Sequence, residues 1–191
     1  MKRSLVIVAL SLIPAAAGAQ SPDPPIVQVR TAAGFSNFLH GDITGIAPTM
    51  RVAVRIGTGR FAIEPEFGLA WLEKTDTFSG GTTNTERTRF QGLGLNAIGR
   101  WPGVRLSPYF GAGLGMYDHR RRNTTVTAGG TTSREFNSPG DAGAQVMGGL
   151  DVKVASRVSA FGEMRLEVRS FQDPGGGSVV QGFGGVAVRL W

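Results

Sequence analysis

The chain consists of stretches in which apolar and polar residues alternate, separated by breaks rich in glycine, threonine and proline. Residues 158–170 are the clearest example, because Val, Ala, Gly, Met, Leu and Val alternate with Ser, Phe, Glu, Arg, Glu and Arg. Successive side chains of a strand point to opposite faces, so this period of two predicts a strand with one apolar and one charged face. Comparable stretches predict strands at residues 26–38, 49–57, 60–74, 87–101, 107–120, 141–154, 158–171 and 179–191.

The connections between these strands alternate in length. Longer connections are expected at residues 39–49, 75–86, 121–140 and 172–178. Short turns are expected at residues 57–59, 102–105 and 155–157. In an up-and-down barrel, all the longer connections then fall at one end, and the short turns and both termini fall at the other. This layout is typical of bacterial outer membrane barrels, so we expect an all-β, eight-stranded antiparallel up-and-down transmembrane β-barrel.

The alternation by itself leaves a second arrangement open. A soluble barrel would turn the apolar face inward and the charged face to water, whereas a membrane barrel reverses the two faces. The soluble alternative is a periplasmic barrel that binds a small apolar ligand.

The first residues of the chain do not belong to this pattern. Lys2 and Arg3 precede an apolar run at residues 5–17, and Ala17-Gly18-Ala19 has the small residues of a cleavage site. We therefore interpret residues 1–19 as a secretory signal peptide, since the apolar run is short for a helix that spans a bilayer. Residues 20–25 form an extended, proline-rich lead-in, and residues 26–191 form the barrel domain.

Composition excludes several kinds of site. The chain has 29 glycines, no cysteine and 2 histidines, so disulfides, thiolate ligands and a multi-histidine metal site are not expected. The formal net charge is +6, but the basic residues are dispersed over the strands, which does not indicate nucleic-acid binding. We expect no cofactor and no metal.

The charged face of the strands predicts a polar barrel interior. Buried charges are costly unless they are paired, so we expect a salt-bridged core that closes the lumen. The inward glycines Gly111, Gly113 and Gly115 would leave room for arginine side chains opposite. The expected interior charges are Arg30, Arg51, Arg55, Glu64, Glu66, Asp151, Lys153, Glu163, Arg165, Glu167, Arg169 and Arg189.

Two further groups of residues, five aromatics and three arginines, are expected at the membrane surfaces. Trp and Tyr prefer the membrane–water interface, so we expect the aromatics Trp71, Trp101, Tyr109, Tyr117 and Trp191 to lie there. Arg120, Arg121 and Arg122 follow where residues 107–120 leave the barrel, and they could contact anionic groups such as lipid phosphates.

An enzyme on the barrel is the least favoured alternative. A hydrolase or transferase of this kind needs a histidine near a serine and a carboxylate. His119 beside Asp118 is the one candidate pair of base and acid that has serine partners, and these, Ser133 and Ser138, are remote in the sequence. His40 lies near Asp42 but has no such serine partner. We therefore expect a non-enzymatic protein, with a lipid-modifying enzyme as the alternative.

Several motifs resemble a known family. The segment Ser107-Pro108-Tyr109-Phe110-Gly111-Ala112-Gly113-Leu114-Gly115, the segment 148–153 followed by 161–165, and the terminal Trp191 resemble small outer membrane barrels of the OmpA, OmpX and opacity-protein type. This resemblance implies an integral protein of the bacterial outer membrane, a monomer in contact with outer membrane lipids and lipopolysaccharide, inserted by the barrel-assembly machinery. The expected role is structural or adhesion-like, through external loops whose partner is not indicated by the sequence.

Overall fold

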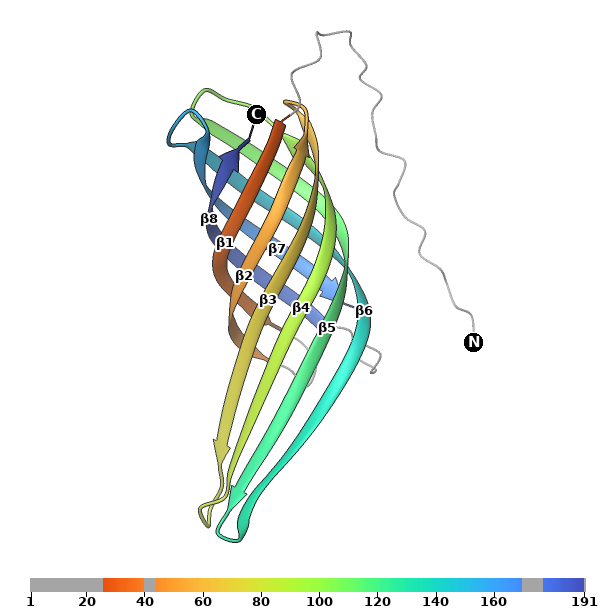
Figure 1. Cartoon of the computed structure of the whole chain (residues 1–191), viewed down its shortest axis with the longest axis vertical. Helices are drawn as coiled ribbons and strands as arrows, with labels where there is room; N and C mark the ends of the chain where they lie inside the picture. Colours follow the sequence, from red (N-terminus) through yellow and green to blue (C-terminus); the bar gives the residue numbers. More distant parts are fainter. Residues whose placement is uncertain (1–25, 40–43, 170–176, 191) are drawn as a thin grey trace, which may run out of the picture.

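The protein is a closed barrel with a long extension at one end (Figure 1). The computed structural model describes residues 26–39, 44–169 and 177–190. The expected signal peptide, the expected lead-in and Trp191 lie outside these residues. The strands are β1 (Ile26–Phe38), β2 (Gly45–Gly57), β3 (Phe61–Thr77), β4 (Thr83–Arg100), β5 (Leu106–Thr127), β6 (Gly130–Lys153), β7 (Val158–Arg169) and β8 (Gly177–Arg189).

Each strand pairs antiparallel with the next one in sequence, and β8 pairs with β1 to close the ring. The register of the closing pair runs from Gln28↔Arg189 to Phe38↔Val179. The eight-stranded up-and-down topology expected from the alternation is therefore confirmed. No helix among the described residues is long and apolar enough to cross a membrane.

Two of the longer connections expected from the sequence, residues 75–86 and 121–140, are largely wrong. β3 and β4 continue through most of the first, and β5 and β6 through most of the second. Thr77 and Thr83 end the β3–β4 hairpin, and Thr127 and Gly130 end the β5–β6 hairpin. Many of the added residues are threonine, which suits an extended backbone. The first connection is also shorter than expected, since β2 begins at Gly45. Figure 1 shows these four strands projecting well past the rest of the barrel. We call this projecting part, residues 72–88 and 120–137, the extension.

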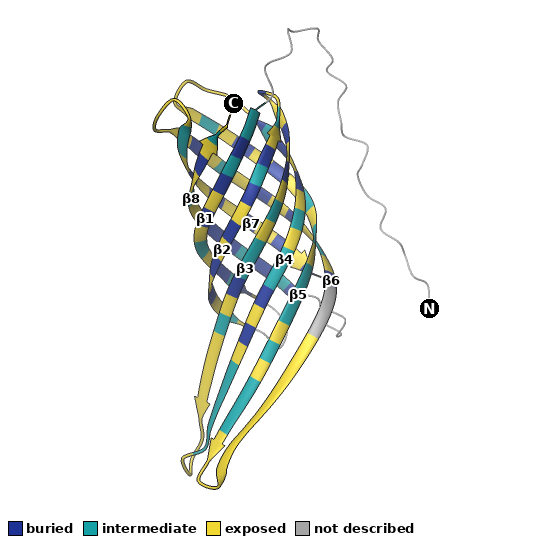
Figure 2. Cartoon of the chain, in the orientation of Figure 1, coloured by how far each residue is buried: buried dark blue, intermediate teal, exposed yellow. Residues whose placement is uncertain are grey.

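The inward and outward sides alternate residue by residue. In β7, every second residue from Phe161 to Arg169 is buried, and the residues between them are exposed. The exposed positions include Met164, Leu166 and Val168, whereas Glu163 and Arg165 are buried (Figure 2). The barrel therefore carries its apolar face outward and its charged face inward, which is the arrangement of a membrane barrel.

Pro65 lies on the outward face of β3 and weakens pairing with β2. The register between the two strands runs to Ala53↔Glu66 and resumes at Ile56↔Ile63. Proline has no N–H to donate to a ladder, which explains the interruption. On its other side, Pro65 stays in register with Leu95 of β4.

Candidate functional site

The barrel interior contains a connected cluster of arginines and carboxylates. Its arginines come from β1, β2 and β7, and its carboxylates come from β3, β6 and β7. All of their side chains are largely shielded from solvent. We call this set the lumen network: Arg30, Arg51, Arg55, Glu64, Glu66, Asp151, Glu163 and Arg165.

The half of the lumen network nearer the short turns is organised around Asp151. Arg30 Nη1 donates to Asp151 Oδ1 at 2.8 Å, and Arg55 Nη1 donates to Asp151 Oδ2 at 3.3 Å. Arg55 Nε also donates to Glu64 Oε2 at 2.6 Å. The hydroxyl of Tyr109 accepts from Arg30 Nη2 at 2.8 Å and donates to Glu163 Oε2 at 2.7 Å. Tyr109 thereby joins two parts of the network.

The other half is organised around Glu66. Arg165 forms a bidentate pair with it, with Nη1 at 2.5 Å from Oε1 and Nη2 at 2.7 Å from Oε2. Arg51 Nη1 donates to Glu66 Oε2 at 2.9 Å, and Gln145 Nε2 donates to Glu66 Oε1 at 2.8 Å. Bidentate, charge-assisted bonds of this kind are among the strongest in proteins.

Aromatic rings support the arginines. The guanidinium of Arg30 lies 3.8 Å from the ring centroid of Phe161, and that of Arg55 lies 4.3 Å from the centroid of Tyr109. A guanidinium over an aromatic face gains a cation–π attraction that strengthens when water is excluded. These rings therefore stabilise charges that would be costly to bury.

A second polar group lies toward the extension. Arg169 hydrogen-bonds to Glu167 and lies over the ring of Tyr117, 4.2 Å from its centroid. Near them, Nδ1 of His119 is 3.5 Å from Oδ2 of Asp141, which is 2% exposed. A β-bulge between Tyr117 and His119 changes the register at this point.

A cavity of about 40 Å³ remains between these two groups, lined in part by Glu66, Tyr117 and Arg169. A buried water needs roughly 10–15 Å³ of such volume, so the cavity has room for a few waters. Sites for small-molecule ligands are about 300–1,000 Å³, so this cavity is far too small for a substrate. The soluble alternative, a barrel with an internal apolar ligand, finds no support in an interior of this polarity and size.

Two expected interior charges lie at the rim of the barrel and not among the residues of the lumen network. Lys153 is exposed, because β6 ends at this residue and its side chain passes the rim of the barrel. Arg189 is half-buried at the same rim, near the end of β8. The other ten expected interior charges face the lumen.

Two of the expected interface aromatics face the lumen instead. Tyr109 is 3% exposed and bonded to Arg30 and Glu163, and Tyr117 stacks on Arg169. Both share a strand face with Gly111, Gly113 and Gly115, so the period of two could have placed them inside. Of the other three, Trp71 and Trp101 point outward, and Trp191 lies outside the described residues.

The space beside the inward glycines of β5 is not filled by arginine. A Cβ at Gly111 would meet Ile98, one at Gly113 would meet Asn96, and one at Gly115 would meet Tyr117. The glycines therefore make room for neighbours on β4 and on β5 itself.

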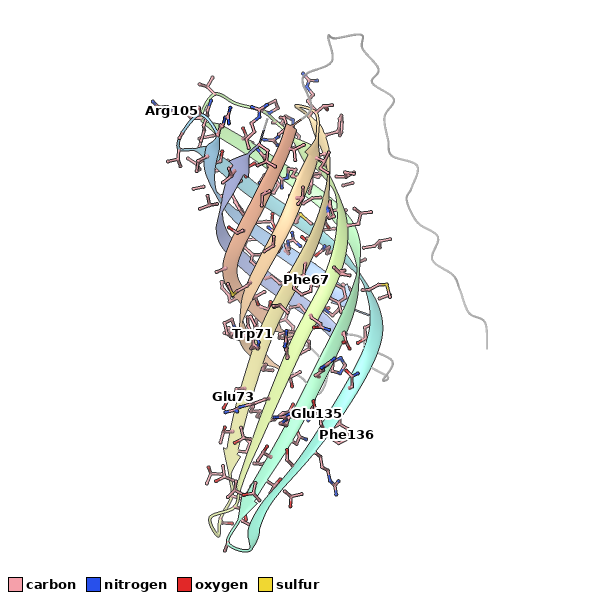
Figure 3. All side chains as sticks on the ribbon, in the orientation of Figure 1. Phe67, Trp71, Glu73, Arg105, Glu135 and Phe136 are labelled. Atoms are coloured by element: carbon pink, nitrogen blue, oxygen red, sulfur yellow. The ribbon has the colours of Figure 1, made fainter. Side chains whose placement is uncertain are left out.

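The outer face changes from apolar to polar where the extension begins. Phe67, Leu93 and Met116 form one row across β3, β4 and β5, and Trp71, Arg89 and Arg120 form a row further on. Figure 3 shows Phe67, Trp71 and Glu73 in succession along β3 toward the extension. Trp71 thus lies where the apolar outer face gives way to arginines.

The three consecutive arginines at this point have different surroundings. Arg120 is exposed and directly opposite Arg89, and neither makes an ion pair within the described ranges. Arg121 Nη2 lies 2.6 Å from Glu86 Oε2, and Arg122 Nη2 lies 3.4 Å from Glu135 Oε2. Arg120 and Arg89 are thus free for other anions, whereas Arg121 and Arg122 have carboxylates of their own.

The expected catalytic candidates are not brought together. His119 pairs with Asp141, and Asp118 instead accepts a hydrogen bond from Gln91 at 3.0 Å. Ser133 lies further along the extension opposite Thr124. The side chain of Ser138 and all of His40 lie outside the described residues. Among the residues described, no group of three or more His, Cys, Asp or Glu could hold a metal ion.

Some residues of the interior were not expected from the sequence. Arg100 is buried, with Nη2 at 3.7 Å from Asp151 Oδ2, and Asn96 accepts a hydrogen bond from Gln145 at 2.7 Å. These positions lie on the inward face of β4 and β6, so the alternation along each strand could have placed them inside. The alternation could not have identified their partners, because the partners lie on other strands.

A closed eight-stranded barrel with lipid-facing apolar residues and a charged interior defines a small transmembrane β-barrel protein. The sequence matches the outer membrane protein beta-barrel domain family over residues 5–185, and the chain belongs to that family. Its location is accordingly the bacterial outer membrane. No protein of curated function matches the chain.

Solved structures share the fold at low sequence identity. Neisserial surface protein A has a TM-score of 0.61 and 15% identity, with 88% of this chain and 99% of that chain covered. A major outer membrane protein of Thermus thermophilus has a TM-score of 0.52 and 13% identity, covering 87% and 100%. Ail of Yersinia pestis, in complex with the heparin analogue sucrose octasulfate, has a TM-score of 0.51 and 11% identity, covering 87% and 97%.

Proposed function

We propose that this protein is a non-enzymatic outer membrane barrel with a closed lumen, which presents the extension of β3 to β6 to other molecules at the cell surface. The extension is the observation that carries this proposal. It includes much of the two longest strands, β5 with 22 residues and β6 with 24. Long loops of membrane barrels face the outside of the cell, so the extension is expected there.

The extension has two features suited to binding. Among the described residues, β6 up to Ala142 pairs only with β5, and β3 beyond Trp71 pairs only with β4. Such edges carry backbone N–H and C=O groups that another strand can use. Arg89 and Arg120 add an unpaired basic site at the base of the extension, suited to lipopolysaccharide phosphates or to a soluble polyanion.

The surface role is tested with cells that display the protein and bind to heparin-coated or albumin-coated surfaces; heparin is chosen because Ail was solved with a heparin analogue. Ser133→Pro in the β6 edge blocks strand addition and leaves the charge unchanged, because Ser133 lies opposite Thr124, whose backbone bonds to β4, so the N–H of Ser133 faces the free edge. Arg89→Gln with Arg120→Gln removes charge and leaves the edge intact. Heparin binding that falls only with the arginines identifies the basic site, and binding that falls with Ser133→Pro identifies the edge.

Replacing residues 72–88 and 120–137 by short turns removes the extension altogether. We expect this variant to fold, because the barrel body keeps its closing pairs, and to lose the surface binding. A variant that binds as well as the unaltered protein would overturn the surface role.

The closed lumen is tested by conductance in planar bilayers. The lumen network and a cavity for only a few waters support a barrier to ions. We expect no steady channel from the unaltered protein, and small channels from the double variant Glu66→Ala with Arg165→Ala. Steady conductance by the unaltered protein would contradict the closed lumen.

A further inference from the structure

The end of the barrel opposite the extension carries a ring of basic residues. Each of the three short turns there contains one exposed arginine: Arg60 between β2 and β3, Arg105 between β4 and β5, and Arg157 between β6 and β7. Arg105 is labelled at this end in Figure 3. We call these residues the turn arginines.

Each turn arginine is bonded through its backbone to a second basic residue. The carbonyl oxygen of Arg60 accepts from Arg100 N, that of Arg105 from Lys153 N, and that of Arg157 from Arg189 N, each at 2.8 Å. The turns and their bonded partners therefore place three pairs of basic residues around one rim.

The described residues of the three turns add no carboxylate to this rim. Residues 57–61, 101–106 and 153–158, which form the turns, contain neither Asp nor Glu. Asp151 is the nearest carboxylate of the lumen network, and it is already bonded to Arg30 and Arg55. The turn arginines make no ion pair within the part of the chain that the structure describes.

Exposed apolar residues in the same turns place these arginines at a membrane surface. Phe61 is 67% exposed, Trp101 59% and Val104 91%, and Val154 and Leu106 are also exposed. Trp101 packs on Phe110 of the outward face, with ring centroids 5.2 Å apart. An arginine beside an exposed aromatic or aliphatic residue fits the depth at which lipid phosphates lie.

We propose that the turn arginines form a binding rim for anionic phospholipid headgroups in the inner leaflet of the outer membrane. Short turns of such barrels face the periplasm, so the lipids in contact with this rim are those of the periplasmic leaflet. Arginine binds phosphate through two parallel hydrogen bonds, and two neighbouring turns can bind the two phosphates of cardiolipin. The rim thereby anchors the barrel end that lacks an extension.

The test is native mass spectrometry of the purified, folded protein in detergent, titrated with cardiolipin, phosphatidylglycerol or phosphatidylethanolamine. We expect the two anionic lipids to bind at least tenfold more tightly than phosphatidylethanolamine. Each basic residue near a membrane surface contributes about fivefold in affinity. The triple variant Arg60→Gln, Arg105→Gln and Arg157→Gln should lose this preference.

The matched control removes three arginines from the extension, Arg87→Gln, Arg122→Gln and Arg134→Gln. It changes the net charge equally and should keep the lipid preference. A heat-dependent shift in gel mobility shows that each variant is folded. The proposal is overturned if the triple variant keeps the preference, if both triple variants lose it equally, or if the unaltered protein has none. Glycerol 1-phosphate, which lacks acyl chains, should not compete at the same concentration; equal competition would overturn the assignment to lipid.

Discussion

Arg165 and Glu66 join opposite walls of the barrel through two hydrogen bonds of 2.5 and 2.7 Å. Arg165 lies on β7 and Glu66 on β3, four strands apart in a closed ring of eight. The Arg30–Tyr109 bond joins β1 to β5 and the Arg55–Asp151 bond joins β2 to β6 in the same manner. Polar contacts thus cross the lumen in three directions.

Breaking the Arg165–Glu66 pair should be costly. Arg165→Met leaves Glu66 with fewer partners and should lower the free energy of unfolding by about 3–5 kcal/mol, because a buried charge loses its compensation. Glu66→Gln should also destabilise, and the double variant should be more stable than the sum of the two changes predicts. Urea unfolding in lipid vesicles measures all three.

The exposed pair Arg87–Glu73 is the matched control, since its side chains are more than half exposed. Arg87→Met should change stability by at most about 1 kcal/mol. Equal effects at the two sites, or strict additivity of Arg165→Met and Glu66→Gln, would show that the lumen pair is not a buried, coupled pair.

Removing the Tyr109 hydroxyl should uncouple the two parts of the lumen network. Tyr109→Phe keeps the ring but deprives Arg30 and Glu163 of one hydrogen bond each. We expect a loss of about 1–3 kcal/mol in unfolding free energy. Ser107→Ala, which removes a half-buried hydroxyl that accepts one hydrogen bond from Gly103 N at 3.2 Å, should cost less. A Tyr109→Phe variant as stable as the unaltered protein would mean that the hydroxyl has no structural role.

Gly113 should be far less tolerant of a methyl group than Gly162. A Cβ at Gly113 would lie 2.6 Å from the carbonyl oxygen of Leu95, which belongs to the backbone and cannot rotate away. Gly162 has no atom within 4 Å of its Cβ position. Gly113→Ala should lower stability by about 1–3 kcal/mol, whereas Gly162→Ala should be neutral. Folded yield and urea midpoint measure both, and equal midpoints would refute the close approach of β4 and β5.

A charge on the outward face should destabilise the barrel only within the membrane. Leu95 is 57% exposed in the apolar belt, so Leu95→Arg should cost about 2–4 kcal/mol if the residue lies near the bilayer midplane. Val126→Arg should have little effect, because this end of β5 belongs to the extension, which is expected to lie in water. Unfolding in vesicles measures the difference. A soluble barrel would tolerate both changes equally.

The odd or even position of a residue along its strand was sufficient to predict most of the interior. Glu163 and Arg165 are inward because they alternate with apolar residues, and this holds whatever their partners are. Tyr109 and Tyr117 were misplaced because the preference of Tyr for interfaces was given more weight than their shared face with Gly111 and Gly113. Lys153 is on the same face of β6 as Asp151. It lies at the end of its strand, however, and alternation does not fix where a strand ends.

The length of the extension could not be predicted in the same way. Threonine, asparagine and charged residues fill residues 75–86 and 121–140, so no apolar alternation marks strands there. The structure forms them because β4 and β5 pair without interruption from Arg100↔Tyr109 to Thr83↔Val126. Polar strands of this kind depend on their neighbours for the backbone hydrogen bonds.

The order of residues along each strand is enough to establish which side chains face lipid and which face the lumen, because a period of two is a local property of an extended chain. Which charges meet depends on the closed ring. Arg165 and Glu66 are 99 residues apart, and their contact requires the closure of β8 onto β1, which sets β3 opposite β7. The tilt and stagger of strands in a closed barrel fix which inward positions lie at the same height, and no single strand contains that information.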